Sequence, residues 1–200
     1  LPGRMAVVGM GRLGGHELTY ASDADVLFVH EPREGASEAD AQGVAVAVAT
    51  EVQRLLKGLG PEPPLEVDAA LRPEGRQGPL SRSLSSFATY YRRWSDVWEA
   101  QALLRAEPVA GDPELGAAFT ALVEGVRYPA DGLDDAQVRQ VRTTKARVEA
   151  ERLPRGVDPR RHVKLGPGGI SDVEWTVQLL QLQHAGAVRS LRTTSTLGAL

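Results

Sequence analysis

Two aspartates two positions apart, with a third further along the chain, are the residues whose types and spacing could support metal chemistry. Asp23 and Asp25 enter the run Ala24–Glu31, whose β-branched and aromatic residues predict a strand. Residues i and i+2 of a strand point to the same side, so we expect both carboxylates to face one point. Asp68 lies in another predicted strand, Pro64–Pro73, and could add a third carboxylate.

Three clustered carboxylates repel one another strongly unless cations lie among them. Mg²⁺ prefers carboxylate oxygens, keeps some of its waters and takes further ligands from phosphates. Two such ions can activate an incoming hydroxyl and stabilise a leaving pyrophosphate, which is the chemistry of nucleotidyl transfer. The pattern therefore predicts a two-metal Mg²⁺ site in which Asp23, Asp25 and Asp68 are both metal ligands and catalytic residues. The alternative is that Ser22-Asp23-Ala24-Asp25 is only a solvated turn before a strand.

The glycines ahead of these acids allow two interpretations. Gly9, Gly11 and Gly14 spell G-x-G-x-x-G after a hydrophobic run, and Glu31 follows about twenty residues later, as in a dinucleotide-binding βαβ unit of an oxidoreductase. Against this, the only helix expected before the next strand, over 16–22, has at most two turns, which is short for such a crossover. The other interpretation is that backbone N–H groups of the glycine turn cradle a triphosphate beside the metals, with close approach or a positive φ at the glycines.

The elements that must position these residues change character along the chain. Ala39–Leu59 has an amphipathic helical period carried by Val44, Val48 and Leu55, and from Leu84 onward the pattern is helical with almost no strand. We therefore expect an α/β domain over residues 1–85 and a helical domain over residues 86–200. The missing initiator methionine and the helical character of the last residues suggest a fragment of a longer protein, cut at both ends.

Composition excludes several classes of protein. The formal net charge is −3, so no basic field indicates nucleic-acid binding. No run approaches eighteen apolar residues, so no membrane span is expected. The chain has no cysteine, which excludes disulfides and weakly favours a reducing compartment such as the cytoplasm.

Four blocks of the sequence together resemble, in order and spacing, the glutamine synthetase adenylyltransferases. They are "GMGRLGGHELTYASDADVLFVH", "EVDAALRPEGRQGPL", "WEAQALLRAEPVAGD" and "VKLGPGGISDVEWTVQLLQLQH". The resemblance implies an α+β fold: a polymerase-β-like nucleotidyltransferase domain with a small mixed sheet, followed by a helical domain. It also implies ATP as a substrate and glutamine synthetase as the protein substrate, with the PII signal protein acting through the full-length enzyme.

The resemblance assigns roles residue by residue. Asp23, Asp25 and Asp68 would be the metal carboxylates. The block containing Lys164 could close over the nucleotide from the helical part, or could be a helix cap in which Asp172 has a salt-bridge partner. The remaining nucleotide-binding residues would be Gly14, Gly15 and Ser22 on the phosphate side and Arg72, in triphosphate binding or in structural pairing.

The family carries two related halves with opposite reactions. One transfers AMP from ATP to a tyrosine of glutamine synthetase, and the other removes it by phosphorolysis. The stretches "GGHELTYASDAD", "RYPADG" and "KARVEAERLPRG", with "KLGPGGISDVEWTVQLLQLQH", resemble the C-terminal, adenylylating half more closely. This resemblance implies Mg²⁺-dependent adenylylation and a role in regulating nitrogen assimilation. Because both halves share the metal motif, the acids alone leave the deadenylylating reaction open, as they do a nucleotide-sensing module without chemistry.

Overall fold

The chain forms two compact units in a computed structural model that describes residues 1–20, 22–58, 60 and 63–200. The first unit comprises Leu1–Ser95 and Arg105–Val126, and the second comprises Asp96–Leu104 and Arg127–Leu200. Neither unit ends at residue 85, because the chain leaves the first unit after Ser95 and returns to it at Arg105. Separate domains over 1–85 and 86–200 stay a prediction.

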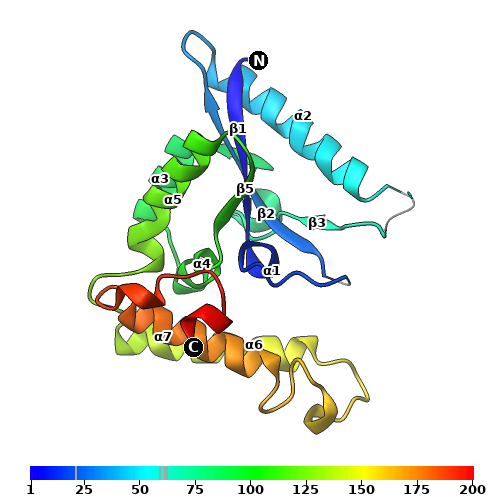
Figure 1. Cartoon of the computed structure of the whole chain (residues 1–200), viewed down its shortest axis with the longest axis vertical. Coiled ribbons are helices and arrows are strands. Elements are labelled where there is room, and N and C mark those ends of the chain that lie inside the picture. Colours follow the sequence, from blue (N-terminus) through cyan, green and yellow to red (C-terminus); the bar gives the residue numbers. More distant parts are fainter. Residues whose placement is uncertain (21, 59, 61–62) are drawn as a thin grey trace. The chain divides into compact units, whose positions relative to one another are not determined.

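The first unit is built on a small mixed sheet, so the fold class of the described residues is α+β (Figure 1). Its strands are β1 (Gly3–Gly9), β2 (Ala24–Pro32), β3 (Val67–Asp68), β4 (Ser81–Ser83) and β5 (Glu107–Gly111). The order is β3-β2-β1-β5, with β4 also paired to β2. β1 is antiparallel to β2 and β5, whereas β3 and β4 run parallel to β2. The central strand β2 is buried from Val26 to His30, which explains its continuous hydrophobic run.

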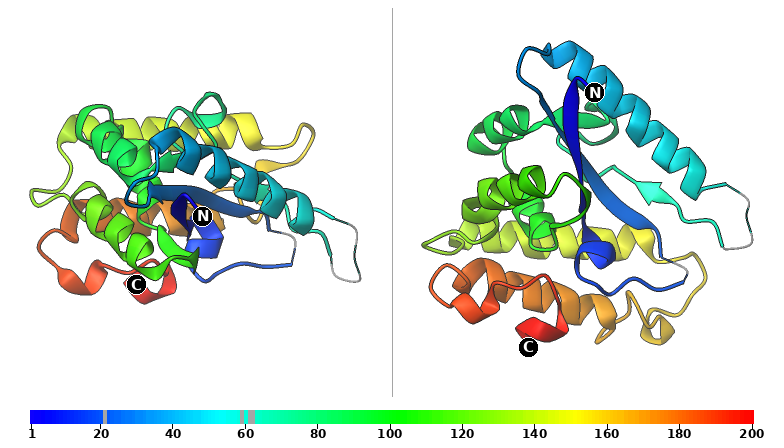
Figure 2. Two further views of the ribbon diagram at one scale, coloured as in Figure 1. Left: turned by 90° about the horizontal axis from the view of Figure 1, so that it is seen from above. Right: turned by 45° about the horizontal axis from the view of Figure 1, so that its top comes forward.

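Helix α2 (Glu38–Leu56) packs against the sheet with its small residues (Figure 2). Ala41, Ala45 and Ala49 recur every four residues and are buried, and Ala49 joins a core with β2. Two residues of the predicted apolar period, Val48 and Leu55, are instead 44% and 60% exposed. Alanines allow the helix axis to approach the strands closely, so methyl groups rather than branched side chains fill this contact.

The connection between β1 and β2 rules out the dinucleotide-binding unit. The two strands are antiparallel, with Gly9 opposite Val26, whereas a βαβ unit requires parallel strands. The helix expected over residues 16–22 is not formed in the described part of that range. Helix α1 spans only Gly11–Gly14, and the chain then passes through a turn in which His16 has a positive φ of 56°.

Two strands differ from their expected lengths and positions. The predicted strand Pro64–Pro73 is reduced to β3, because a turn held by Asp68 and Arg72 follows at once. The expectation of almost no strand after Leu84 misses β5, which pairs with β1 through an irregular register at Val7 and Val8. Pro108 and Gly111 within β5 are poor strand formers, so tertiary pairing decides this element. The remaining helices of the first unit are α3 (Leu84–Arg93) and α5 (Pro113–Arg127).

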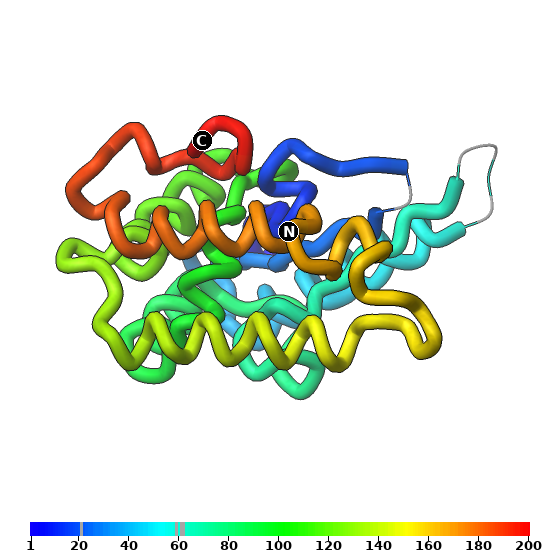
Figure 3. Tube along the Cα trace, turned by 90° about the horizontal axis from the view of Figure 1, so that it is seen from below, coloured from blue at the N-terminus to red at the C-terminus, as the bar shows by residue number. Residues whose placement is uncertain are grey.

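The second unit is helical. Its helices are α4 (Val97–Leu103), α6 (Asp135–Arg152) and α7 (Ile170–His184), and α6 and α7 run side by side in Figure 3. Asp134 caps α6 by accepting a hydrogen bond from the Gln137 N–H, and the Gln137 side chain accepts from the Asp134 N–H. These helices confirm the helical pattern expected for this part of the chain. Among the described residues, no helix combines the length and apolar character needed to cross a bilayer.

Candidate metal site

Three carboxylates converge where β2 begins and β3 ends. Asp23, Asp25 and Asp68 each offer one oxygen, and these oxygens all lie within 4.8 Å of one another. Asp23 is exposed, while Asp25 and Asp68 are partly buried. The expectation that the three carboxylates lie close together is therefore confirmed, and their binding of a metal stays a prediction.

Strand pairing explains why residues so distant in sequence meet. Asp25 on β2 lies directly opposite Asp68 on β3 in the parallel register, and Ala24 lies opposite Val67. The Ala24 N–H also donates to the Glu66 carbonyl at 2.8 Å. Asp23 immediately precedes β2 and reaches the same side as Asp25, as the two-residue period of extended chain requires.

The turn after β3 fixes Asp68 and its surroundings. One Asp68 carboxylate oxygen accepts a hydrogen bond from the Ala70 N–H at 2.8 Å. The Arg72 guanidinium donates to the carbonyls of Ala69, Arg76 and Gly78 at 2.7, 3.2 and 3.1 Å. Burial lowers the pKa of Arg72, and the Asp68 carboxylate acts in the opposite direction. These contacts are those of the structural pairing expected for Arg72, and its contact with a nucleotide stays a prediction.

The glycine pair is engaged in local structure. The Gly14 N–H donates to the Met10 carbonyl at 3.0 Å, and the Gly15 N–H donates to the Gly11 carbonyl at 3.1 Å. The expected positive φ is wrong for this pair: Gly14 lies in α1 and Gly15 has φ −79°. It occurs instead at Gly11, with φ +50° beside the Asp25 carboxylate. A phosphate-binding role for Gly14 and Gly15 stays a prediction.

Ser22 and Lys164, the two other predicted nucleotide-binding residues, belong to different units of the chain. The Ser22 hydroxyl lies 2.8 Å from the Thr19 hydroxyl and accepts a hydrogen bond from the Thr19 N–H. Lys164 belongs to the second unit, where its side chain is exposed and its carbonyl accepts from the Ser171 N–H. Nucleotide contacts of both residues stay predictions.

Two acids that the sequence singled out have structural partners. Glu31 accepts hydrogen bonds from the Arg4 guanidinium at 2.7 and 2.9 Å, consistent with a pairing role at the end of β2. In the second unit, Asp172 accepts from the Gly168 N–H at 2.6 Å and pairs with Lys145 at 2.5 Å. Its pKa is lowered, chiefly by the Lys145 ammonium and then by the Gly168 N–H. These are the contacts of a cap with a salt bridge.

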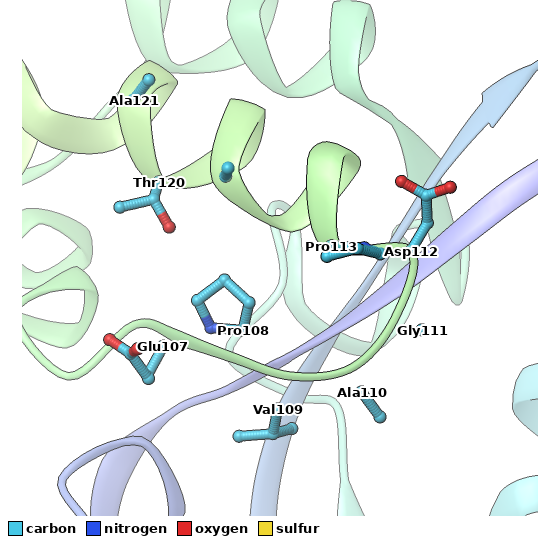
Figure 4. A pocket seen from close by; sticks show the side chains of 10 residues that line it. Glu107, Pro108, Val109, Ala110, Gly111, Asp112, Pro113, Thr120 and Ala121 are labelled. Atoms are coloured by element: carbon cyan, nitrogen blue, oxygen red, sulfur yellow. The ribbon is translucent and has the colours of Figure 1, made fainter.

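A separate pocket of about 630 Å³ lies between β5 and α5 (Figure 4). Pro108 points toward α5 in this view, and Thr120 and Ala121 line the opposite wall. No member of the acid cluster lines this pocket, so its size alone does not mark the reactive centre.

Sequence comparisons connect both parts of the chain with nucleotidyltransferases. Residues 2–122 match the family described as glutamate-ammonia ligase adenylyltransferase, and residues 136–200 match the one described as GlnD PII-uridylyltransferase. Proteins named bifunctional glutamine synthetase adenylyltransferase/adenylyl-removing enzyme are 64% identical in Streptomyces avermitilis and 61% identical in Streptomyces coelicolor, each over 200 residues. The one from Mycobacterium tuberculosis H37Rv is 57% identical over 199 residues. The matches cover 100% of this chain but 20% of each relative.

Proposed function

The chain belongs to the glutamate-ammonia ligase adenylyltransferase family, and we propose that its first unit transfers AMP from ATP to a tyrosine hydroxyl of glutamine synthetase. The observation that carries this proposal is the convergence of Asp23, Asp25 and Asp68 within 4.8 Å. The names of the relatives supply the protein substrate, and nucleotidyl transfer is the chemistry that such an acid cluster suits.

The donor set fits Mg²⁺. Carboxylate oxygens are hard ligands, and the partial exposure of the cluster leaves room for waters and phosphate oxygens to complete an octahedral shell. When bound, Mg²⁺ would promote deprotonation of the attacking hydroxyl and neutralise charge on the leaving pyrophosphate. We propose a two-metal arrangement, because three carboxylates supply more ligands than one magnesium ion usually takes from protein.

The protein's own residues would orient the reaction. Asp23, Asp25 and Asp68 would hold the metal, and the hydrogen bond from the Ala70 N–H would keep the Asp68 carboxylate in one orientation. Gly14, Gly15 and Ser22 would lie toward the phosphates, while Arg72 would hold the turn that follows Asp68. The tyrosine oxygen would form a bond to the α-phosphorus as the bond to the β-phosphate oxygen breaks, and the tyrosine proton would leave to solvent.

The finer assignments rest on resemblance. A polymerase-β-like fold is supported by the mixed sheet that carries the acids at one strand edge. The adenylylating direction is supported by the resemblance of the stretches Arg127–Gly132 and Lys164–His184 to the C-terminal half of the family. Regulation by the PII signal protein, a cytoplasmic location and a role in nitrogen metabolism are proposals of the same kind.

Product analysis tests the proposal. The chain is mixed with unmodified glutamine synthetase, ATP and Mg²⁺, and pyrophosphate release is followed together with the mass of the synthetase. We expect one AMP added per pyrophosphate released, and neither product with EDTA. Nucleotide binding without pyrophosphate would indicate a sensing module. ADP formation from adenylylated synthetase and phosphate, without the forward reaction, would indicate the deadenylylating activity.

A further inference from the structure

We infer that Gly11 is a positioning residue of the metal site: its missing side chain leaves the space that the Asp25 carboxylate occupies. This inference rests on the proposed metal site. Gly11 belongs to the G-x-G-x-x-G pattern, whose dinucleotide explanation fails because β1 and β2 are antiparallel. The glycine at this position therefore calls for another physical explanation.

The geometry supplies that explanation. A Cβ atom on Gly11 would lie 2.4 Å from Asp25 Oδ2, well inside the van der Waals separation of carbon and oxygen, and 3.4 Å from its Cγ. Gly11 also has a φ of +50°, a conformation that side chains rarely adopt. Any residue other than glycine would therefore compete with the carboxylate for the same position.

The backbone around this contact is fixed, so the side chain is the part that can move. The Met10 N–H donates to the Asp25 carbonyl at 2.8 Å, which ties the residue before Gly11 to β2. Asp25 is further held by the pairing of β2 with β3. A methyl group at position 11 would thus displace the Asp25 carboxylate from its position in the cluster while leaving the strands in place.

The other glycines of the pattern meet different atoms. A Cβ on Gly14 would lie 1.7 Å from the Arg105 carbonyl oxygen, and one on Gly9 would lie 2.9 Å from a Val109 methyl group. Of these three glycines, Gly11 is the one whose added side chain would meet a carboxylate of the cluster. Substitution there should change metal binding, whereas substitution of Gly14 should change folding.

The test compares Gly11→Ala with Gly35→Ala in the full chain. Gly35 has a φ of +80° and nothing within 4 Å of an added Cβ, so its alanine variant carries the backbone strain without the clash. Mn²⁺ binding is measured by electron paramagnetic resonance and stability by thermal unfolding without metal. We expect Gly11→Ala to raise the Kd for Mn²⁺ about ten- to a hundredfold. Gly35→Ala should bind as the unsubstituted chain does, with both variants melting at similar temperatures.

Asp25→Asn separates failure of this inference from failure of the site. If Asp25→Asn weakens Mn²⁺ binding but Gly11→Ala does not, Gly11 has no positioning role and the acid cluster still stands. If Asp25→Asn also binds Mn²⁺ normally, the proposed metal site fails and the inference fails with it. A Gly11→Ala chain that melts far below Gly35→Ala would show a structural role and overturn the inference as well.

Discussion

Asp25 and Asp68 stand directly opposite each other on the parallel strands β2 and β3. This pairing brings together two acids that are far apart in the sequence, and Asp23 completes the cluster from the approach to β2. Hydrogen bonds between β2 and β3 fix the positions of Asp25 and Asp68, so the sheet sets the separation of these two carboxylates. A site built in this way is suited to holding ions at a defined spacing.

Removing one charge from the cluster should abolish transfer without harming the fold. We expect Asp25→Asn and Asp23→Asn each to lower the rate of AMP transfer by at least about a hundredfold, because metal-based charge neutralisation contributes several kcal/mol. Without Mg²⁺, their melting temperatures should equal or exceed that of the unsubstituted chain, since repulsion within the cluster is relieved. Asp131→Asn, at an exposed acid of the second unit, is the control. Near-normal transfer by either cluster variant would refute the assignment.

Arg72→Ala should act through the turn after β3. The Arg72 guanidinium donates to three backbone carbonyls, so its removal should lower the free energy of unfolding by about 1–3 kcal/mol. Arg76→Ala is the matched control, because Arg76 contributes its carbonyl to this network and its side chain is exposed. Chemical denaturation measures both. A raised KM for ATP with unchanged stability would instead assign Arg72 to the triphosphate.

Gly14→Ala should damage the fold itself. The added methyl group would meet the backbone carbonyl of Arg105, which cannot move aside, so we expect a loss of about 3 kcal/mol or more. Gly43→Ala is the contrasting helical variant: an added Cβ meets nothing within 4 Å in α2, and it should stabilise by about 0.5–1 kcal/mol. Equal melting temperatures for the two variants would contradict the packing of α1 against residue 105.

Acid should weaken the second unit through Asp172. Its pKa is lowered by Lys145 and the Gly168 N–H, so the folded state binds its proton less readily than the unfolded chain does. The stabilisation is therefore fully present above the unfolded pKa of about 3.9 and is lost as the pH falls through the lower, folded pKa. Asp172→Asn should cost about 1 kcal/mol at pH 7 and almost nothing at the acidic end. A pH-independent difference between the two chains would argue against the ion pair.

The acid cluster could be predicted from the sequence because it depends on the short-range spacing of residues along strands. The i, i+2 spacing of Asp23 and Asp25 fixes their common side, and the stretch around Asp68 predicts a strand, although the observed strand is shorter. The packing of α2 was not accessible in the same way. The valines and leucines of α2 carry the hydrophobic period in the sequence. The helix nevertheless packs against the sheet through its alanines, which are the buried residues.

Tertiary contacts also explain the other differences between the predicted and the observed structure. The β5 sequence contains Pro108 and Gly111, so its strand character comes from pairing with β1 rather than from propensity. Gly11 carried a signal in the glycine pattern, but the sequence alone cannot show that the atom beside it is an Asp25 oxygen. Long-range register, rather than local preference, supplies that information.

The most direct test of the metal site is the position of the ion itself. Crystals of the chain grown with Mn²⁺ and a non-hydrolysable ATP analogue would show manganese by anomalous scattering. We predict a peak bound by oxygens of Asp25 and Asp68, with Asp23 ligating the same ion or a second one about 4 Å away, and the triphosphate reaching the metal. Manganese bound elsewhere, with the three carboxylates free of metal in the presence of the nucleotide, would contradict the account.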